Sequence, residues 1–219
     1  MAFGVGDAID LGEFRIDFAL GFAPGSSPRR AFMDAIIFIV RTLLQVLLVT
    51  VFILRVLFPL VRADSRNQLS QAVIRLTNPL VIPLRRVLPP IGKVDTASLV
   101  AVLIVQAASA AVLWLLGAFP GVHQTSSFIA VVLLYVISTT LQIYIFSMFL
   151  YVVLSWVAPG TYSPAAALFT SICEPLLRPV RRIIPPIAQI DLSAFFVMVL
   201  LIALNMVVNN WLRPYQYFL

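Results

Sequence analysis

Four long apolar runs dominate the chain, and each predicts a helix that spans a membrane. They lie at about 31–61, 97–119, 127–157 and 192–212, and few charged residues interrupt them. Roughly 20 apolar residues in a helix cross the hydrocarbon core of a bilayer, and every run reaches that length. The pattern therefore predicts an all-α polytopic membrane protein with about four transmembrane helices.

The connections that follow the first and third runs have a different pattern. Apolar residues recur at helical spacing in 63–77, and a loop followed by a short helix is expected at 159–173. A segment rich in proline and arginine follows each: NPLVIPLRRVLPPIGKVD at 78–95 and EPLLRPVRRIIPPIAQID at 174–191. Apolar side chains lie on one side of these segments and the arginine pairs point away. This arrangement is typical of an amphipathic segment in a membrane interface.

The two Pro/Arg segments are copies of each other, ninety-six positions apart. Half of their eighteen aligned positions are identical: Pro79/Pro175, Leu80/Leu176, Pro83/Pro179, Arg85/Arg181, Arg86/Arg182, Pro89/Pro185, Pro90/Pro186, Ile91/Ile187 and Asp95/Asp191. Prolines and a diarginine repeated in register indicate an internal duplication. We therefore divide the chain into an N-terminal extension and linker (1–30), a first repeat (31–122) and a second repeat (123–219). Because each repeat holds two spans, a pseudo-symmetry axis along the membrane normal relates them.

The prolines predict that only short helical pieces form inside each copy. Asn78 resembles an N-cap followed by proline at the first helical position, and Pro83 would interrupt a helix begun there. The second copy places Glu174, Pro175 and Pro179 at the equivalent positions. The pairs Pro89-Pro90 and Pro185-Pro186 act as stops.

An aspartate ends each copy, just before the next apolar run. Asp95 and Asp191 are suited to cap the following helix, whose positive N-terminal end favours a carboxylate. Pairing between these aspartates and the arginines of the same copy is an alternative that the sequence leaves open.

Composition agrees with the membrane class and limits the chemistry. The chain is 61% apolar and only 11% charged, with a mean hydropathy of +1.02, which no soluble globular surface tolerates. The single cysteine, Cys173, excludes a disulfide within the chain, and with the single histidine, His123, it excludes a Cys/His metal cluster. The sequence contains no recognisable catalytic triad, carboxylate pair or phosphate loop, so we expect neither an enzyme nor a cofactor.

Basic residues are distributed unequally between the two sides of the predicted membrane. The formal net charge is +6, and the connections at 62–96 and 158–191 hold nine Lys and Arg residues against four on the opposite side. The positive-inside rule then predicts cytoplasmic Pro/Arg segments and both termini outside. Arg29 and Arg30, directly before the first span, favour the opposite orientation. Because the basic residues adjoin membrane spans, we expect anionic lipids and no nucleic acid as partners.

A few polar residues interrupt the spans and are candidates for function. Arg41 and Gln45 lie in the first span, where a central charge is costly and often functional. The interpretation that we favour places Arg41 and Arg55 toward opposite ends of a long tilted helix, with their side chains extending to the interfaces. Asn205 and Asn209, one turn apart in the fourth span, predict hydrogen bonds between helices, within the chain or to a partner.

The doubled motif resembles the YggT family, also called YlmG. The motif is (E/N)-P-L-x-x-P-(L/V)-R-R-(V/I)-(L/I)-P-P-I-x-x-(V/I)-D followed by an apolar helix, and the resemblance covers nearly everything from residue 31 on. The second copy, with Trp156 before it and Ser193 after it, is the closer match. The first departs from the pattern, with Asn78 opposite Glu174 and Leu60 opposite Trp156.

The resemblance implies an integral membrane protein of the bacterial inner membrane and no common enzymatic activity. It also implies links to osmotic-stress tolerance, potassium handling or cell division, and plastid relatives are associated with assembly of a membrane cytochrome complex and with nucleoid distribution. On this basis we favour a non-enzymatic accessory, assembly or organising factor. Its lipid- and partner-binding residues would be Arg85, Arg86, Arg181 and Arg182.

The alternative function is a small oligomeric transporter or channel component for an ion or osmolyte such as potassium. The duplication, Arg41 and the polar residues of the third and fourth spans support it. A transporter normally has broken spans that face each other at the midplane. Here the prolines lie mainly in the connections, which favours the organising factor.

Overall fold

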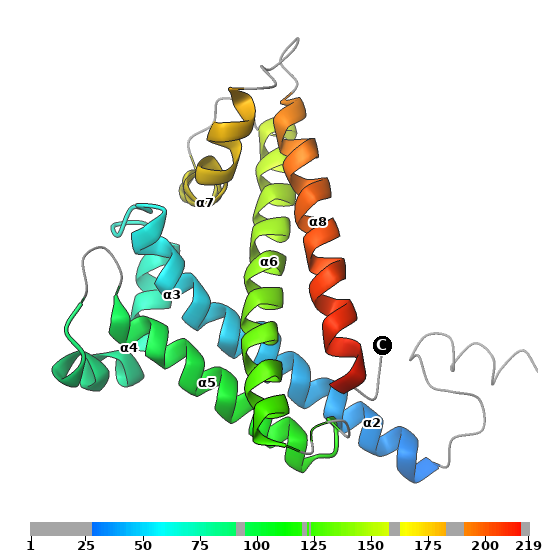
Figure 1. Cartoon of the computed structure of the whole chain (residues 1–219). Coiled ribbons are helices and arrows are strands. Elements are labelled where there is room, and N and C mark those ends of the chain that lie inside the picture. Colours follow the sequence, from blue (N-terminus) through cyan, green and yellow to red (C-terminus); the bar gives the residue numbers. More distant parts are fainter. Residues whose placement is uncertain are drawn as a thin grey trace, which may run out of the picture. The chain divides into compact units, whose positions relative to one another are not determined.

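Helices form all the regular structure in the described part of the chain. The computed structural model describes residues 28–90, 95–119, 122, 124–157, 163–182 and 191–215 (Figure 1). Four helical stretches are long and apolar enough to span a membrane: Phe32–Leu60, Thr96–Leu115, Thr125–Val157 and Leu192–Tyr215. The predicted all-α class with four membrane-spanning helices is confirmed.

The chain divides into two compact units, Met1–Val40 and Arg41–Leu219. In the first unit the structure describes only helix α2, which runs from Pro28 to Arg41 and so ends at the first residue of the second unit. The second unit holds the remaining elements: η1 (Thr42–Val49), α3 (Thr50–Leu60), α4 (Gln68–Val87), α5 (Thr96–Leu115), α6 (Thr125–Val157), α7 (Pro164–Arg181), α8 (Leu192–Leu212) and η2 (Arg213–Tyr215). The element η1 is a π-helix, which the apolar pattern of the first span does not indicate.

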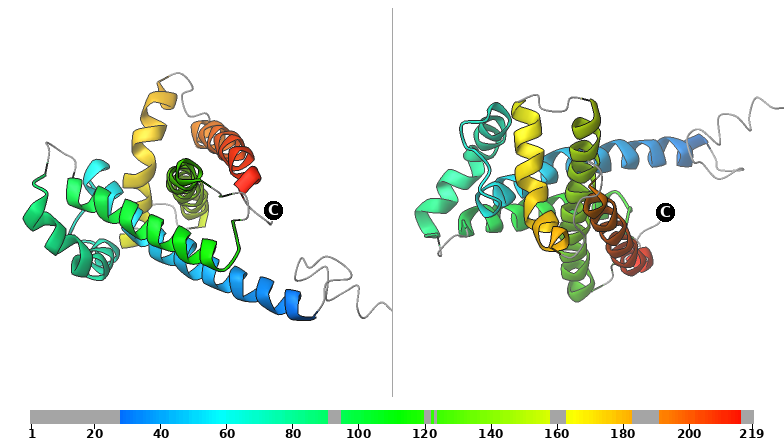
Figure 2. Two further views of the ribbon diagram at one scale, coloured as in Figure 1. Left: turned by 60° about the horizontal axis from the view of Figure 1, so that its bottom comes forward. Right: turned by 90° about the horizontal axis from the view of Figure 1, so that it is seen from above.

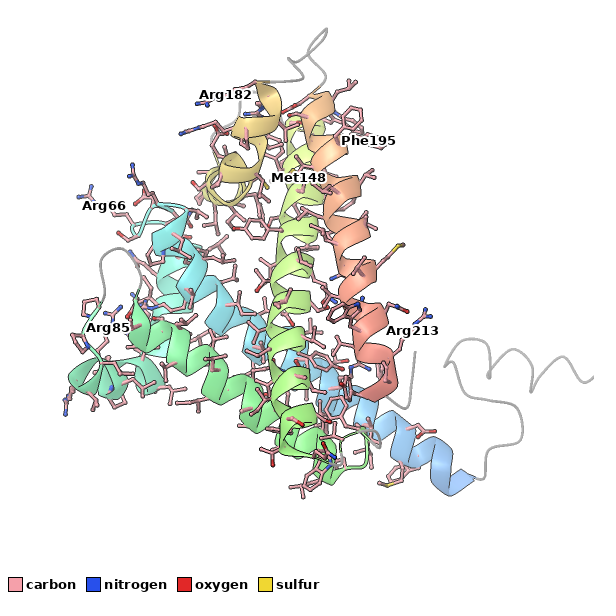
Figure 3. All side chains as sticks on the ribbon, in the orientation of Figure 1. Arg66, Arg85, Met148, Arg182, Phe195 and Arg213 are labelled. Carbon is pink, nitrogen blue, oxygen red and sulfur yellow. The ribbon has the colours of Figure 1, made fainter. Side chains whose placement is uncertain are left out.

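Each repeat within the second unit packs two spans against one connecting helix. Val49, Phe52, Val81 and Ala101 belong to a core that joins α3, α4 and α5. A second core joins α6, α7 and α8, and its central residue, Met148, is fully buried between them (Figure 3). Figures 1 and 2 show α6 and α8 side by side, with α7 beside the end at which α8 begins. The connecting helices α4 and α7 fall in the two connections for which the sequence predicts helical segments.

The two connecting helices also meet each other. Phe58, Val73, Leu168 and Ile172 form a small buried cluster that joins α3, α4 and α7. At the start of both helices, the side-chain amide of Asn67 donates a hydrogen bond to the backbone oxygen of Pro164 at 2.5 Å. The connections of both repeats therefore lie at the same end of the second unit.

The prediction of short helical pieces is wrong, because α4 and α7 run unbroken through their prolines. Pro79 and Pro83 lie inside α4, and Pro175 and Pro179 lie inside α7. An interior proline costs about 3 kcal/mol, chiefly through a lost hydrogen bond and a clash with the preceding turn. In each helix the prolines are four residues apart and exposed, so the backbone oxygens that lose a partner lie on the outer face. The opposite, buried face supplies the packing that keeps the helix continuous.

The predicted N-cap at Asn78 is likewise wrong, since Asn78 lies in the middle of α4. The helix begins eleven residues earlier, where the side chain of Asn67 accepts a hydrogen bond from the backbone N–H of Leu69 at 2.9 Å. Ser163, ninety-six positions later, caps α7 by accepting from the N–H of Ala166 at 3.1 Å, with Pro164 at the first helical position. The duplication therefore extends to the caps, although the residue types differ.

The helices end where turn chemistry stops them. Helix α4 ends at Val87, just before Pro89-Pro90, as predicted, whereas Pro185-Pro186 lie outside the described residues. Helix α5 ends at Leu115, four residues before the predicted limit, because Gly117 adopts a positive φ of 80°. The N–H groups of Gly117 and Ala118 then bond back to Trp114 and Leu113, both at 2.9 Å.

Candidate functional site

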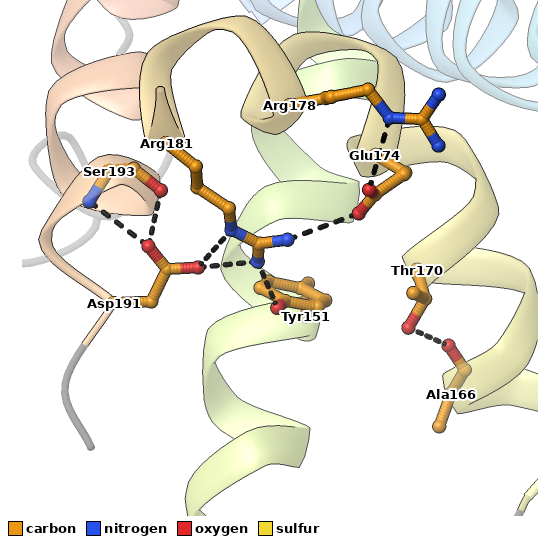
Figure 4. A network of polar contacts seen from close by, with 8 residues as sticks. All are labelled: Tyr151, Ala166, Thr170, Glu174, Arg178, Arg181, Asp191 and Ser193. Atoms are coloured by element: carbon orange, nitrogen blue, oxygen red, sulfur yellow. Dashed lines mark hydrogen bonds and ion pairs between the residues drawn. The ribbon is translucent and has the colours of Figure 1, made fainter. Parts of the chain in front are cut away.

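In the second repeat, Arg181 at the end of α7 joins three helices. Its guanidinium donates to Oδ2 of Asp191 at 3.0 Å and 2.5 Å, to Oε2 of Glu174 at 3.1 Å and to the hydroxyl of Tyr151 at 2.8 Å (Figure 4). Asp191 begins α8, Glu174 lies on α7 and Tyr151 lies on α6. We call Arg181, Asp191, Glu174 and Tyr151 the second clamp.

Asp191 also caps α8, which confirms the predicted cap. The alternative that the sequence left open, an ion pair with an arginine of the same copy, is present as well. Its Oδ1 accepts from the N–H of Ser193 at 3.1 Å and from the Ser193 hydroxyl, while Oδ2 binds Arg181. Burial alone would raise the pKa of Asp191, but hydrogen bonds from Ser193 and Arg181 and the charge of Arg181 outweigh it and lower the pKa. Burial would lower the pKa of Arg181, yet Asp191 and Tyr151 raise it. Both groups therefore stay charged.

In the first repeat, Arg85 near the end of α4 pairs with Asp95 at the N-cap position of α5. The side chain of Asp95 makes no cap hydrogen bond, so the predicted cap is wrong for this residue. The carboxylate of Asp95 also accepts from the hydroxyl of Ser98 at 2.6 Å. Burial tends to raise the pKa of Asp95, but hydrogen bonds from Arg85 and Ser98, with the charge of Arg85, lower it overall. We call Arg85 and Asp95 the first clamp.

The prediction that both arginines of each pair point away is wrong for Arg181, which is partly buried among its partners, whereas Arg85 is exposed although it pairs with Asp95. Arg85 and Arg181 turn to their aspartates, whereas Arg86 and Arg182 are exposed and make no ion pair with any residue that the structure describes. Figure 3 shows Arg182 at the outer end of α7. Each copy of the motif thus holds one structural arginine and one that is available to the surroundings.

Sequence reasoning missed Tyr151, and it considered Arg55 only as a charge near an end of the first span. They stand ninety-six positions apart, so they are equivalent in the two repeats, although the spans around them show no obvious similarity. Arg55 is only 7% exposed. Arg55 lies in the last two turns of α3, toward an end of the first span as expected, but its side chain packs largely against protein and does not extend into the surroundings.

Two of the predicted intramembrane residues lie in or beside the π-helix. The guanidinium of Arg41 lies 5.8 Å from the ring centroid of Tyr135 on α6, a cation–π contact. Gln45 is buried, and its side-chain amide finds no hydrogen-bond partner among the described residues. The side-chain amide of Gln106 on α5 is also buried without a hydrogen-bond partner among the described residues.

Asn205 and Asn209 join α8 to α6 within this chain. The amide of Asn205 donates to the backbone oxygen of Ser138 at 3.2 Å, and the amide of Asn209 donates to Oδ1 of Asn205 at 2.7 Å. The hydroxyl of Ser138 donates to Oδ1 of Asn209 at 3.2 Å. The predicted hydrogen bonding between helices is confirmed within this chain.

The remaining titratable side chains offer no reactive or metal-binding centre in the described residues. No three His, Cys, Asp or Glu side chains gather there as a metal site. Cys173 is fully buried in α7, and burial raises the pKa of its thiol to about 12, so the nucleophilic thiolate is suppressed.

The helices and clamps can now be compared with known proteins. The model of the family described as CCB3/YggT matches this chain twice, over residues 33–116 and 130–212. The chain belongs to the CCB3/YggT family. Each YggT match encloses one Pro/Arg segment and its clamp arginine and aspartate.

Several curated proteins are similar to this YggT chain over most of its length. An uncharacterized protein of Pseudomonas aeruginosa is 41% identical over 80% of this chain and 89% of its own length. The uncharacterized protein YggT of Escherichia coli K12 is 33% identical over 83% of this chain and 93% of its own. No solved structure matches the chain. None of these similarities points to catalysis.

Proposed function

We propose that this YggT protein is a non-enzymatic organiser of the bacterial inner membrane, an accessory or assembly factor that binds anionic lipid and a membrane-protein partner. The observation that supports this proposal most is that the two adjacent arginines of each Pro/Arg segment have different surroundings. In each repeat one arginine fixes an amphipathic helix to the next span, and the adjacent arginine is exposed. A helix held in this way presents a fixed cation at the membrane surface.

The outer face of α4 has the composition that an interfacial helix needs. Its exposed apolar residues are Leu69, Leu76, Ile82 and Val87. Arg75 and Arg86 are exposed on the same helix. Apolar side chains of this kind favour the acyl boundary, and guanidiniums favour lipid phosphates.

The proposal also includes the side of the membrane on which α4 and α7 lie and the cellular process in which the partner acts. The excess of basic residues in the Pro/Arg connections supports a cytoplasmic position for α4 and α7, with both termini outside. The partner is expected to act in osmotic-stress tolerance or cell division, the processes that the family resemblance implies.

The test exchanges the exposed arginines and keeps the clamps. Arg86→Gln with Arg182→Gln should reduce recovery of copurifying protein and anionic lipid from native membranes, read by mass spectrometry after mild-detergent purification. Arg213→Gln, an exposed arginine outside the Pro/Arg segments, serves as the control. Recovery in the double variant equal to that of the unaltered protein would reject the proposal.

One observation favours the alternative, a small transporter or channel component. The π-helix in the first span is a rare element that often accompanies functional sites, and it carries the buried Gln45. Buried amides without partners, at Gln45 and Gln106, are suited to hold water or an ion. Liposomes containing the protein should then pass potassium or an osmolyte under a gradient, and Gln45→Leu should abolish the flux. Absence of flux in the unaltered protein would reject this alternative.

A further inference from the structure

The two repeats place different charges at equivalent positions around their clamps. Arg55 in the first repeat corresponds to Tyr151 in the second, and Asn78 corresponds to Glu174. The second clamp therefore has a neutral phenol and a carboxylate where the first has a guanidinium and a neutral amide. Because the two repeats share the same order of helices, equivalent positions around the two clamps can be compared directly.

A charge count shows the consequence. Around the second clamp, Arg178 and Arg181 carry two positive charges and Glu174 and Asp191 carry two negative charges, so the net charge is zero. Around the first clamp, Arg55 and Arg85 carry two positive charges and Asp95 carries one negative charge, so the net charge is +1. The first repeat thus lacks one negative charge that the second repeat contains.

Arg55 is the cation without a counterpart. It is 7% exposed, and it forms no hydrogen bond or ion pair within the part of the chain that the structure describes. It lies near enough to Arg85 and Asp95 to interact electrostatically with both. The carboxylate of Asp95 accepts from Arg85 and Ser98 through Oδ2, and among the described residues it accepts no hydrogen bond from Arg55. A largely buried guanidinium without an ion pair is unfavourable, and the nitrogens of Arg55 are not among the fully buried atoms without partners, so an anion from outside can reach it.

The position of these residues indicates which anion fits. Arg55 lies in the last two turns of α3, Arg85 lies near the end of α4, and Asp95 directly precedes α5, so all three lie near helix ends. The ends of membrane-spanning helices are the parts that meet the membrane surface. Phosphate groups are the anions at this depth, and guanidiniums bind them through paired hydrogen bonds.

We propose that Arg55 and Arg85 form a binding site for a phosphate group at the first clamp. The group is either the headgroup phosphate of an anionic lipid or free phosphate. This site rests on the lipid-binding part of the proposed function and adds to it one position that binds phosphate. Arg86 and Arg182 are not part of this site, because their side chains lie on the outer surface.

The experiment titrates the purified full-length protein with phosphatidylglycerol and with phosphatidylcholine of the same chains, and counts bound lipid by native mass spectrometry. Arg55→Gln should weaken the tightest phosphatidylglycerol site about tenfold, as expected for one charge-assisted contact. Arg55→Tyr introduces the residue that the second repeat has at this position and should weaken the same site to a similar degree. It keeps the test decisive if Arg55→Gln does not fold. Tyr151→Arg with Glu174→Asn should create a second tight site.

Each outcome decides the question. If inorganic phosphate raises the unfolding temperature of the unaltered protein and not of Arg55→Gln, the bound group is free phosphate. If phosphate has no effect and the phosphatidylglycerol site depends on Arg55, the group is a lipid headgroup. The proposal is overturned if the Arg55 variants bind phosphatidylglycerol and inorganic phosphate as tightly as the unaltered protein does. Arg86→Gln with Arg182→Gln should keep the tight site while losing the copurifying partner, so failure of the proposed function is distinguishable from failure of this site.

Discussion

At the scale of single residues, one arginine in each repeat connects the helix between the two spans, α4 or α7, to the start of the next span. Arg181 and Asp191 retain only 29% and 23% of their side-chain exposure, so their ion pair is partly shielded from water. The bonds to Asp191, Glu174 and Tyr151 together occupy most of the five N–H donors of Arg181. A pair with this degree of satisfaction stabilises the fold more than a surface ion pair does.

Asp191→Asn should therefore destabilise the protein. We expect a loss of roughly 2 kcal/mol in the free energy of unfolding, because one charge-assisted pair is lost and the Arg181 guanidinium keeps fewer partners. Thermal or denaturant unfolding in detergent measures it. Arg178→Gln is the matched control, since Arg178 is 69% exposed and its ion pair should contribute below about 0.5 kcal/mol. Equal effects of the two substitutions would contradict the clamp.

The lowered pKa values of Asp95 and Asp191 predict how stability depends on pH. A carboxylate whose pKa is lower in the folded state stabilises fully above its unfolded pKa, about 3.9. Its contribution is lost as the pH falls through the folded pKa. The unfolding temperature should thus stay level from pH 7 to about 5 and decrease below about 4. Asp95→Asn with Asp191→Asn should flatten that decrease, and an unchanged pH profile in this variant would contradict the assignment.

Residue types alone could predict only part of the clamps. The aspartates before apolar runs indicate caps, and the repeated arginines draw attention to the motif. Tyr151 and Arg55 could not be found in this way, because each lies in a long apolar span and only the tertiary fold brings it to the arginine. The 96-residue offset was the one available signal, and it becomes informative only once Tyr151 is seen beside Arg181.

At the scale of elements, α4 and α7 show how packing overrides a local breaker. The prolines predict interruption because their local cost is large, but the sequence does not show that each pair shares one exposed face. Thr77 and Val81 in α4, like Cys173 and Leu177 in α7, are buried at equivalent positions on the other face. The continuity of these helices was therefore a property of the fold, not of local propensity.

Pro83→Ala tests this continuity. Because α4 is already helical at this position, the substitution restores a backbone donor and relieves the ring clash, and the protein should become more stable by about 1 kcal/mol or more. The unfolding temperature in detergent measures the change, with Pro89→Ala, beyond the end of the helix, as the control. Destabilisation by Pro83→Ala would mean that a break at this residue belongs to the native state.

At the scale of the whole molecule, the pattern of apolar runs predicted the four spans because bilayer thickness requires uninterrupted apolar length. The internal duplication was equally accessible from the repeated motif. The contact between α4 and α7 was not, since the hydrogen bond from Asn67 to Pro164 joins residues ninety-seven positions apart without a distinctive pattern. That contact brings the connections of both repeats to one end of the second unit.

The central claim of the proposed function is that α4 and α7 present their exposed arginines to the cytoplasmic leaflet. The most direct test replaces Cys173 by Ala and introduces one cysteine at a time, as Arg86→Cys, Arg182→Cys or Arg213→Cys, for labelling with a membrane-impermeant thiol reagent. We predict that the cysteine at position 213 is labelled in spheroplasts and that those at 86 and 182 are labelled only after permeabilisation. Labelling of position 86 or 182 from outside would contradict the account.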